Sequence, residues 1–152
     1  MAEEKYLKAY SKSALGNYLV SNKGIKQNCI TFTGTATVLN LTLSDEDSGS
    51  TVFLNGTAAA STITLPAQDA GLEFDFVCTA DNSAHATVIA GLFDGHVADA
   101  DSVTDLADAT ESITLVASKC KIGDSFRVIS NGTKWIVSGR FITDAAVTAQ
   151  DA

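Results

Sequence analysis

The stretch that decides the fold spans residues 62–77 and reads TITLPAQDAGLEFDFV. Its first part alternates threonine with large apolar residues, and its last part alternates acidic residues with Phe74 and Phe76. Alternation with a period of two is typical of a strand with one buried face. Pro66, the only proline of the chain, and Gly71 lie between the two runs. The stretch therefore predicts two strands joined by a corner.

Similar short runs continue on both sides of this stretch, from Cys29 onward, at intervals of roughly 8 to 12 residues. The clearest pair is FRVIS and KWIVSGRFI, which Asn131 and Gly132 join as a hairpin turn. There is no alternation of strands with helices, so a doubly wound fold is not expected. The sequence predicts an all-β domain, an antiparallel β-sandwich, jelly roll or barrel. The expected strands are 29–33, 36–43, 51–54, 61–65, 72–79, 86–91, 113–117, 126–130 and 134–142.

The chain divides by composition into an N-terminal arm (1–28), a β-rich body (29–143) and a C-terminal tail (144–152). The arm holds all three tyrosines and five lysines against two glutamates, a net charge of +3. The remainder holds five basic residues against sixteen acidic ones, a net charge of −11. The tail is small and polar, and we expect it to fray or to lie on the surface.

The arm is a candidate contact segment because its apolar residues have helical spacing, and Gly16 would end such a helix. A turn is expected at 21–24. So short a helix is not stable alone in water, and it must dock either on the body or on a partner. Both alternatives stay open at this point. The residues expected to make the contact are Tyr6, Leu7, Tyr10, Leu15, Tyr18, Leu19 and Val20.

Composition limits the classes of function. The 152 residues are 45% hydrophobic, and no apolar run approaches the roughly 18 residues that cross a membrane. The first residues lack the apolar core of a secretory signal, so we expect synthesis in the cytoplasm. The acidic body should repel nucleic acid. We expect neither a membrane nor a nucleic acid as partner.

Catalytic motifs are missing from the sequence, so we expect no enzyme activity and no cofactor. His85 and His96, the only histidines, are interpreted as surface residues. Glu73 and Asp75 have the spacing of paired carboxylates, but their alternation with phenylalanines favours an ordinary solvent face.

The three cysteines, Cys29, Cys78 and Cys120, are widely spaced and form no C-x-x-C pair. We interpret them as reduced thiols rather than as a metal site or a disulfide.

An acidic stretch at 92–110 has no basic residue and is interpreted as a long surface loop. Asp99 and Asp101 have calcium-ligand spacing, but Val103 occupies the next ligand position, which excludes an EF-hand. A solvated loop is the favoured interpretation. A non-standard cation site and a contact with a basic partner surface remain alternatives.

The order of features in the body resembles a β-rich domain of tailed-phage virion proteins, found in head decoration (cement) proteins and in tail-fibre and tailspike modules. The resemblance covers about residues 50–140. It is carried by ITLPAQDAG (63–71), FDFV (74–77) and GDSFRVISNGTKWIVSG (123–139).

The resemblance implies a structural virion protein that binds the outer surface of the major capsid shell and stabilises it. The expected partners are the major capsid protein and further copies of this chain in a homotrimer, and the expected location is the virion surface. The alternative is a receptor- or glycan-binding tip of a tail fibre, which predicts an exposed shelf of aromatic side chains.

Overall fold

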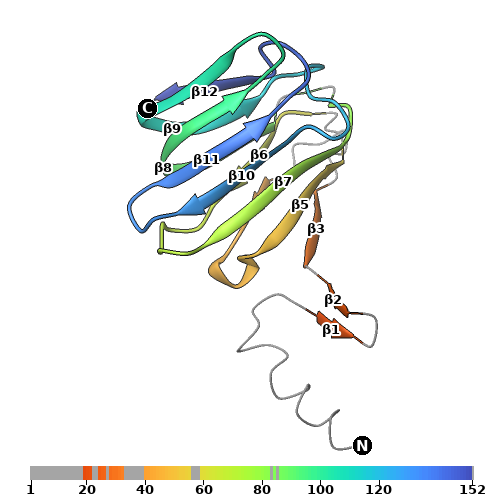
Figure 1. The fold of residues 1–152 in the computed structure, drawn as a ribbon, viewed down its shortest axis with the longest axis vertical. Coiled ribbons are helices and arrows are strands. Elements are labelled where there is room, and N and C mark those ends of the chain that lie inside the picture. Colours follow the sequence, from red (N-terminus) through yellow and green to blue (C-terminus); the bar gives the residue numbers. More distant parts are fainter. Residues whose placement is uncertain are drawn as a thin grey trace, which may run out of the picture.

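Figure 1 shows the computed structural model of the chain, which describes residues 19–21, 24–26, 28–32, 40–55, 59–82, 84 and 86–151. Five of the predicted contact residues of the arm therefore lie outside the described residues: Tyr6, Leu7, Tyr10, Leu15 and Tyr18. Leu19 and Val20 lie in β1 (Leu19–Ser21), which pairs antiparallel with β2 (Gly24–Lys26). The hairpin closes between Ser21 and Gly24, where the sequence predicts a turn.

The rest of the described chain is built from strands, and it contains one short 3-10 helix, η1 (Asp45–Asp47). The prediction of an all-β domain is confirmed. The strands are β3 (Cys29–Phe32), β4 (Asn40–Thr42), β5 (Ser50–Asn55), β6 (Ser61–Thr64), β7 (Glu73–Ala80), β8 (Ala86–Ala98), β9 (Val103–Leu115), β10 (Ser125–Ser130), β11 (Trp135–Arg140) and β12 (Val147–Asp151).

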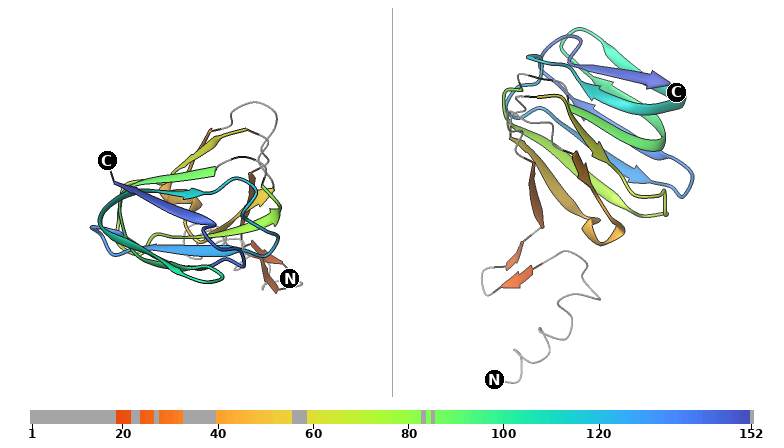
Figure 2. Two further views of the ribbon diagram at one scale, coloured as in Figure 1. Left: turned by 90° about the horizontal axis from the view of Figure 1, so that it is seen from above. Right: turned by 180° about the vertical axis from the view of Figure 1, so that it is seen from behind.

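The strands form two layers of a sandwich that share the long hairpin β8–β9 (Figures 1 and 2). The first half of β8 pairs with β6, and the second half pairs with β11. The register of β8 and β9 shifts between Ile89 and Gly95, where the strands pass from one layer to the other. The smaller layer holds β4, β6 and β12, and the larger layer holds β3, β5, β7, β10 and β11.

The pairing within the layers is mixed, which corrects the expectation of an antiparallel sandwich. β3, β5 and β7 run parallel to one another, and β4, β6 and β8 do the same. Antiparallel pairs occur at β7–β10–β11 and at β8–β9–β12. The physical reason is that successive strands cross between the layers, so the neighbours of a strand come from distant parts of the sequence.

The stretch 62–77 makes one of these crossings, as its sequence predicts. β6 lies in the smaller layer and β7 in the larger one, and the segment between them buries Leu65. Gly71 has a φ of 91°, a conformation that favours glycine. Its N–H donates to the carbonyl of Ser130 at 2.9 Å, and the Ser130 N–H donates to the Leu72 carbonyl at 2.8 Å. The corner is therefore tied to the end of β10.

Aromatic side chains fill the space between the layers. The Trp135 and Phe74 rings are 5.8 Å apart between centroids, and Phe126 stacks on Phe76 at 4.6 Å. Gly139 is paired with Phe126 across β10 and β11, and a Cβ at position 139 would lie 2.5 Å from the Phe126 Cβ. Burial of such large apolar surfaces is the main source of stability in a sandwich.

The acidic stretch 92–110 is not a long loop, and this prediction was wrong. It forms the second half of β8 and the first half of β9, joined by a four-residue turn. The strands form because Phe93, Val97 and Leu106 are fully buried, which outweighs the acidic composition of the stretch. Among the described residues, no three acidic, histidine or cysteine side chains lie close enough together to hold a metal ion.

The tail also differs from expectation, because residues Val147–Asp151 form β12 on β9. Ala146 and Val147 are buried, so the body continues through this segment instead of ending in a fraying tail.

Within the described ranges, no helix has the length and apolarity to cross a membrane.

Candidate interaction face of the large sheet

One transverse row of side chains crosses the outer face of the larger layer. Alternate residues of a strand point to the same face, and the register brings one such residue from each strand into line. The burial pattern agrees, because Phe76, Phe126 and Val137 beside this row are buried in the core. The row consists of Cys29, Thr51, Asp75, Arg127, Ser138, His96 and Asp105.

Arg127 is the central charge of this row, and it bridges two carboxylates of β7. Its Nη2 donates to Glu73 Oε2, and its Nε lies 3.7 Å from Asp75 Oδ1. The three side chains are 46%, 36% and 41% exposed, so the predicted solvent face of Glu73 and Asp75 is confirmed. The pairing with Arg127 was not predicted, because it depends on the register between β7 and β10.

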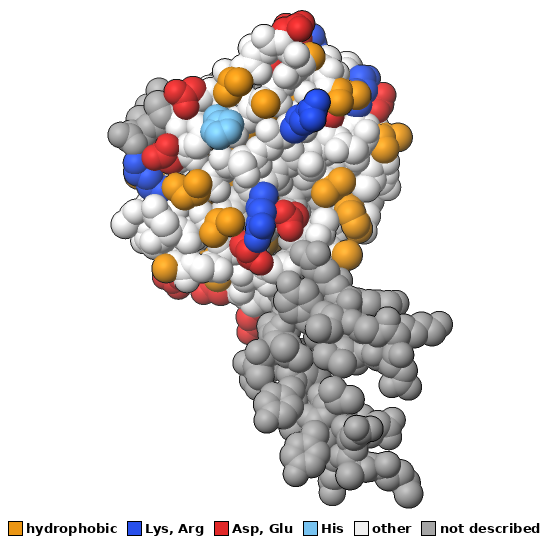
Figure 3. All heavy atoms as spheres, viewed as in Figure 1, with side chains coloured by type: hydrophobic (Ala, Val, Ile, Leu, Met, Phe, Trp, Pro, Cys, Tyr) orange, Lys and Arg blue, Asp and Glu red, His pale blue; other side chains and the backbone are white. Residues whose placement is uncertain are grey.

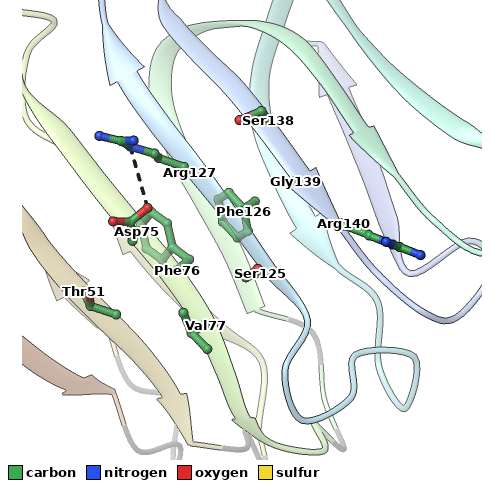
Figure 4. Close-up of a pocket in the computed structure, with 10 residues that line it drawn as sticks. All are labelled: Thr51, Asp75, Phe76, Val77, Ser125, Phe126, Arg127, Ser138, Gly139 and Arg140. Atoms are coloured by element: carbon green, nitrogen blue, oxygen red, sulfur yellow. Dashed lines mark ion pairs between the residues drawn. The ribbon is translucent and has the colours of Figure 1, made fainter.

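A shallow groove with a volume of about 450 Å³ lies on this face, beside Arg127 (Figure 4). In Figure 4 Arg127 points toward Asp75, whereas Arg140 points away from it. Thr51, Ser125 and Ser138 add hydroxyl groups to the lining, and Val77 and Gly139 add apolar surface. Such a lining offers hydrogen-bond donors and acceptors to a polar partner surface.

The row also brings Ser138, His96 and Asp105 onto adjacent strands, an arrangement that the sequence could not reveal. No hydrogen bond joins these three side chains, as the described part of the chain shows them, and all three are exposed. A hydrolytic triad needs hydrogen bonds between its members and N–H donors for an oxyanion. The N–H groups of paired strands are engaged in the hydrogen-bond ladder of the sheet. His85 lies outside the described residues.

Apolar side chains on the outer face are scattered. Ile129 and Ile136 form an exposed cross-strand pair, next to the ion pair of Lys134 with Asp94 at 3.1 Å. Figure 3 shows hydrophobic side chains at several separate places on this face, and basic side chains beside acidic ones. The face therefore suits a polar contact better than an apolar one.

Three more exposed apolar residues lie at one end of the body: Val103 at the start of β9, Ile122 in the connection between β9 and β10, and Ile142 in the connection after β11. Val103, Ile122 and Ile142 are 60%, 69% and 65% exposed. Hydrogen bonds tie these connections together: the Ile142 N–H donates to Asp124 Oδ1 at 3.0 Å, and the Ala145 N–H donates to Asp99 Oδ2 at 3.0 Å. We call Val103, Ile122 and Ile142 the apolar end.

The fold and these surfaces define an all-β sandwich with a polar sheet face and an apolar end. Comparison with protein-family models, with curated proteins and with solved structures found no match for this chain.

Proposed function

We propose that the protein is a structural virion protein, a decoration or cement protein that binds the outer surface of a capsid shell and stabilises it. The observation that carries the proposal is the β1–β2 hairpin. Its strands pair with each other, and with no strand of the body among the described residues (Figure 1). Each has three residues. A hairpin this small is not stable alone in water. We therefore expect it to pack against another protein surface.

The surface that the arm contacts belongs to the capsid or to a neighbouring copy in a homotrimer. The arm supplies aromatic side chains and a net charge of +3, a combination that suits an acidic surface with apolar pockets. The chain after the arm (29–152), with its net charge of −11, offers an acidic surface to the arm of another copy. The proposed contact residues remain Tyr6, Leu7, Tyr10, Leu15, Tyr18, Leu19 and Val20.

The apolar end supports the same function, because it gives the body a contact surface of its own in addition to the arm. Isolated exposed apolar side chains are common on protein surfaces. Here Ile122 and Ile142 lie on connections of the body, Val103 begins β9, and hydrogen bonds hold the connections at this end together. We propose that a protein partner covers these exposed side chains.

The alternative, a glycan-binding tip, finds less support. It requires an exposed aromatic shelf, but Trp135 is fully buried, and so is every described phenylalanine except the half-buried Phe53. The two phenylalanines that line the groove beside Arg127, Phe76 and Phe126, are buried, so neither exposes a ring on which a sugar would stack. The decoration role is therefore the better account of the described surface.

The test compares the full chain with a chain that lacks residues 1–24, both added to purified capsids of the phage that encodes the protein. We expect the truncated chain to keep its fold by circular dichroism and to lose at least tenfold in capsid affinity. Equal binding by the two chains would refute the role of the arm. A glycan array with a clear hit, together with no capsid binding, would favour the tail-fibre alternative.

A further inference from the structure

Two of the three cysteines belong to the same hydrophobic core although they are distant in sequence. Cys78 lies on β7 and is 3% exposed, and Cys120 lies in the β9–β10 connection and is fully buried. The β9–β10 connection is hydrogen-bonded to both the N–H and the carbonyl of Cys78. The Cys78 N–H donates to the Asp124 carbonyl at 2.8 Å, and the Gly123 N–H donates to the Cys78 carbonyl at 2.8 Å.

Polar side chains hold this connection in place. The side chain of Asn82 donates from Nδ2 to the Val116 carbonyl at 3.1 Å and accepts the Cys120 N–H at Oδ1 at 3.0 Å. Asp124 Oδ2 accepts the Lys121 N–H at 2.8 Å. Both Asn82 and Asp124 are buried. The backbone of Cys120 is thus fixed against the end of β7.

The thiol of Cys120 points into the core, where it lies 3.8 Å from the Ala146 carbonyl oxygen. Cys78 belongs to the same cluster of buried core residues. Hydrogen bonding with Cys78, followed by burial, raises the pKa of Cys120. None of the cysteines, all of which the structure describes, forms a disulfide here.

We propose that Cys78 and Cys120 form an intramolecular disulfide when the protein meets an oxidising medium. A small-molecule disulfide such as oxidised glutathione is the oxidant. The thiolate of one cysteine attacks it, forming a mixed disulfide and releasing one small thiol. The second cysteine then attacks the mixed disulfide and releases the other small thiol. Two protein thiols are oxidised, and one small disulfide is reduced to two thiols.

The environment of the pair sets when this reaction takes place. The reactive species is the thiolate, and the raised pKa of Cys120 keeps it protonated in the folded protein. Oxidation therefore requires either opening of the β9–β10 connection or refolding in the presence of oxidant. A reducing cytoplasm keeps both thiols free. Under the proposed function, the bond would form after virions are released, and it would fasten the β9–β10 connection to β7.

The experiment uses the Cys29→Ser chain, because Cys29 is exposed and would compete for oxidant. The chain is refolded with oxidised glutathione, denatured, and assayed for free thiols and intact mass. We expect both thiols to disappear, a mass loss of about 2 Da, and a melting temperature higher by about 10 °C. Free thiols, or glutathione adducts without a cross-link, would overturn the proposal.

Matched controls carry a second substitution, Cys78→Ala or Cys120→Ala, in the Cys29→Ser background. We expect neither control to lose 2 Da, and the melting temperature of each to be the same with and without oxidant. A rise of about 10 °C in either control would show that the stabilisation comes from something other than this bond, and would contradict the proposal.

Discussion

Phe126 on β10 stacks on Phe76 on β7, with ring centroids 4.6 Å apart and ring planes 8° from parallel. The next residue along β10, Arg127, points to the opposite side and pairs with Asp75 of β7. One pair of strands therefore contributes an aromatic stack to the core and an ion pair to the outer face. Because side chains alternate along β7 and β10, the packing of the core also determines which side chains face outward toward partners.

Truncation of Phe76 to alanine tests the aromatic core. We expect Phe76→Ala to lower the free energy of unfolding by about 3–5 kcal/mol, because it leaves a cavity beside Phe126. Ile136→Ala, at a site that is 41% exposed, serves as control, with an expected loss below about 1 kcal/mol. Urea denaturation measures both. Similar losses in the two variants would contradict the described core.

Gly95 is required where β8 passes close to β11. It has a φ of 116°, and an added Cβ would overlap the Val137 carbonyl oxygen. We expect Gly95→Ala to destabilise the fold by more than about 3 kcal/mol, since backbone strain and steric overlap add. Gly49→Ala is the matched control, because Gly49 has a φ of 79° but open space around it, and its cost should be about 1 kcal/mol. Denaturant midpoints that rank the variants in the opposite order would refute this packing.

Asp99 gives the turn between β8 and β9 a dependence on pH. Hydrogen bonds from Ser102 hold the pKa of the Asp99 carboxyl below its ordinary value of 3.8, and the Ala145 N–H adds to the effect. A lowered pKa means that the ionised form stabilises the fold above the ordinary pKa, and that this stabilisation disappears as the pH falls through the lowered value. We expect Asp99→Asn to weaken the loss of stability below pH 3.8. Thermal melts at several pH values measure it, and an unchanged pH profile would contradict this role.

Asn131 stabilises the β10–β11 hairpin through its side chain. Its Oδ1 accepts the N–H groups of Thr133 and Lys134, each at 2.9 Å. We expect Asn131→Ala to cost about 1 kcal/mol, whereas Asn131→Asp, which keeps the acceptor, should cost less. The free energy of unfolding of each variant checks this. Equal losses would show that the acceptor does not matter.

The apolar end provides a test of the body contact in the proposed function. We expect the double substitution Ile122→Ser and Ile142→Ser to lower capsid affinity, while the melting temperature stays the same, because both side chains are more than half exposed. The control pair is Ile129→Ser and Ile136→Ser on the outer sheet face. A larger loss of binding in the control pair would assign the contact to the sheet face instead.

Local signals explain what the sequence predicted correctly. Pro66 and Gly71 mark a corner, and Asn131 with Gly132 marks a hairpin, since the conformations of these residues depend on their own backbone. The stretch 92–110 was misjudged because its many aspartates suggested a loop, while the burial of Phe93 and Leu106 depends on the opposite layer. Parallel pairing could not be predicted for the same reason.

The candidate surfaces were harder to predict than the fold. The pairing of Arg127 with Asp75 and the meeting of Cys78 with Cys120 join residues that are far apart in sequence. Only the register of the strands and the course of the β9–β10 connection bring them together. The outward direction of Glu73 and Asp75 could be predicted, because it follows from alternation with Phe74 and Phe76.

The most direct measurement of the central claim is sedimentation of the full chain with purified capsids over a range of concentrations, followed by heating of the loaded capsids. We predict that the protein sediments with capsids to a fixed number of copies per shell and raises the temperature at which the shells release DNA. A chain that remains in the supernatant at every concentration, or one that saturates the shells without changing that temperature, would contradict the proposed function.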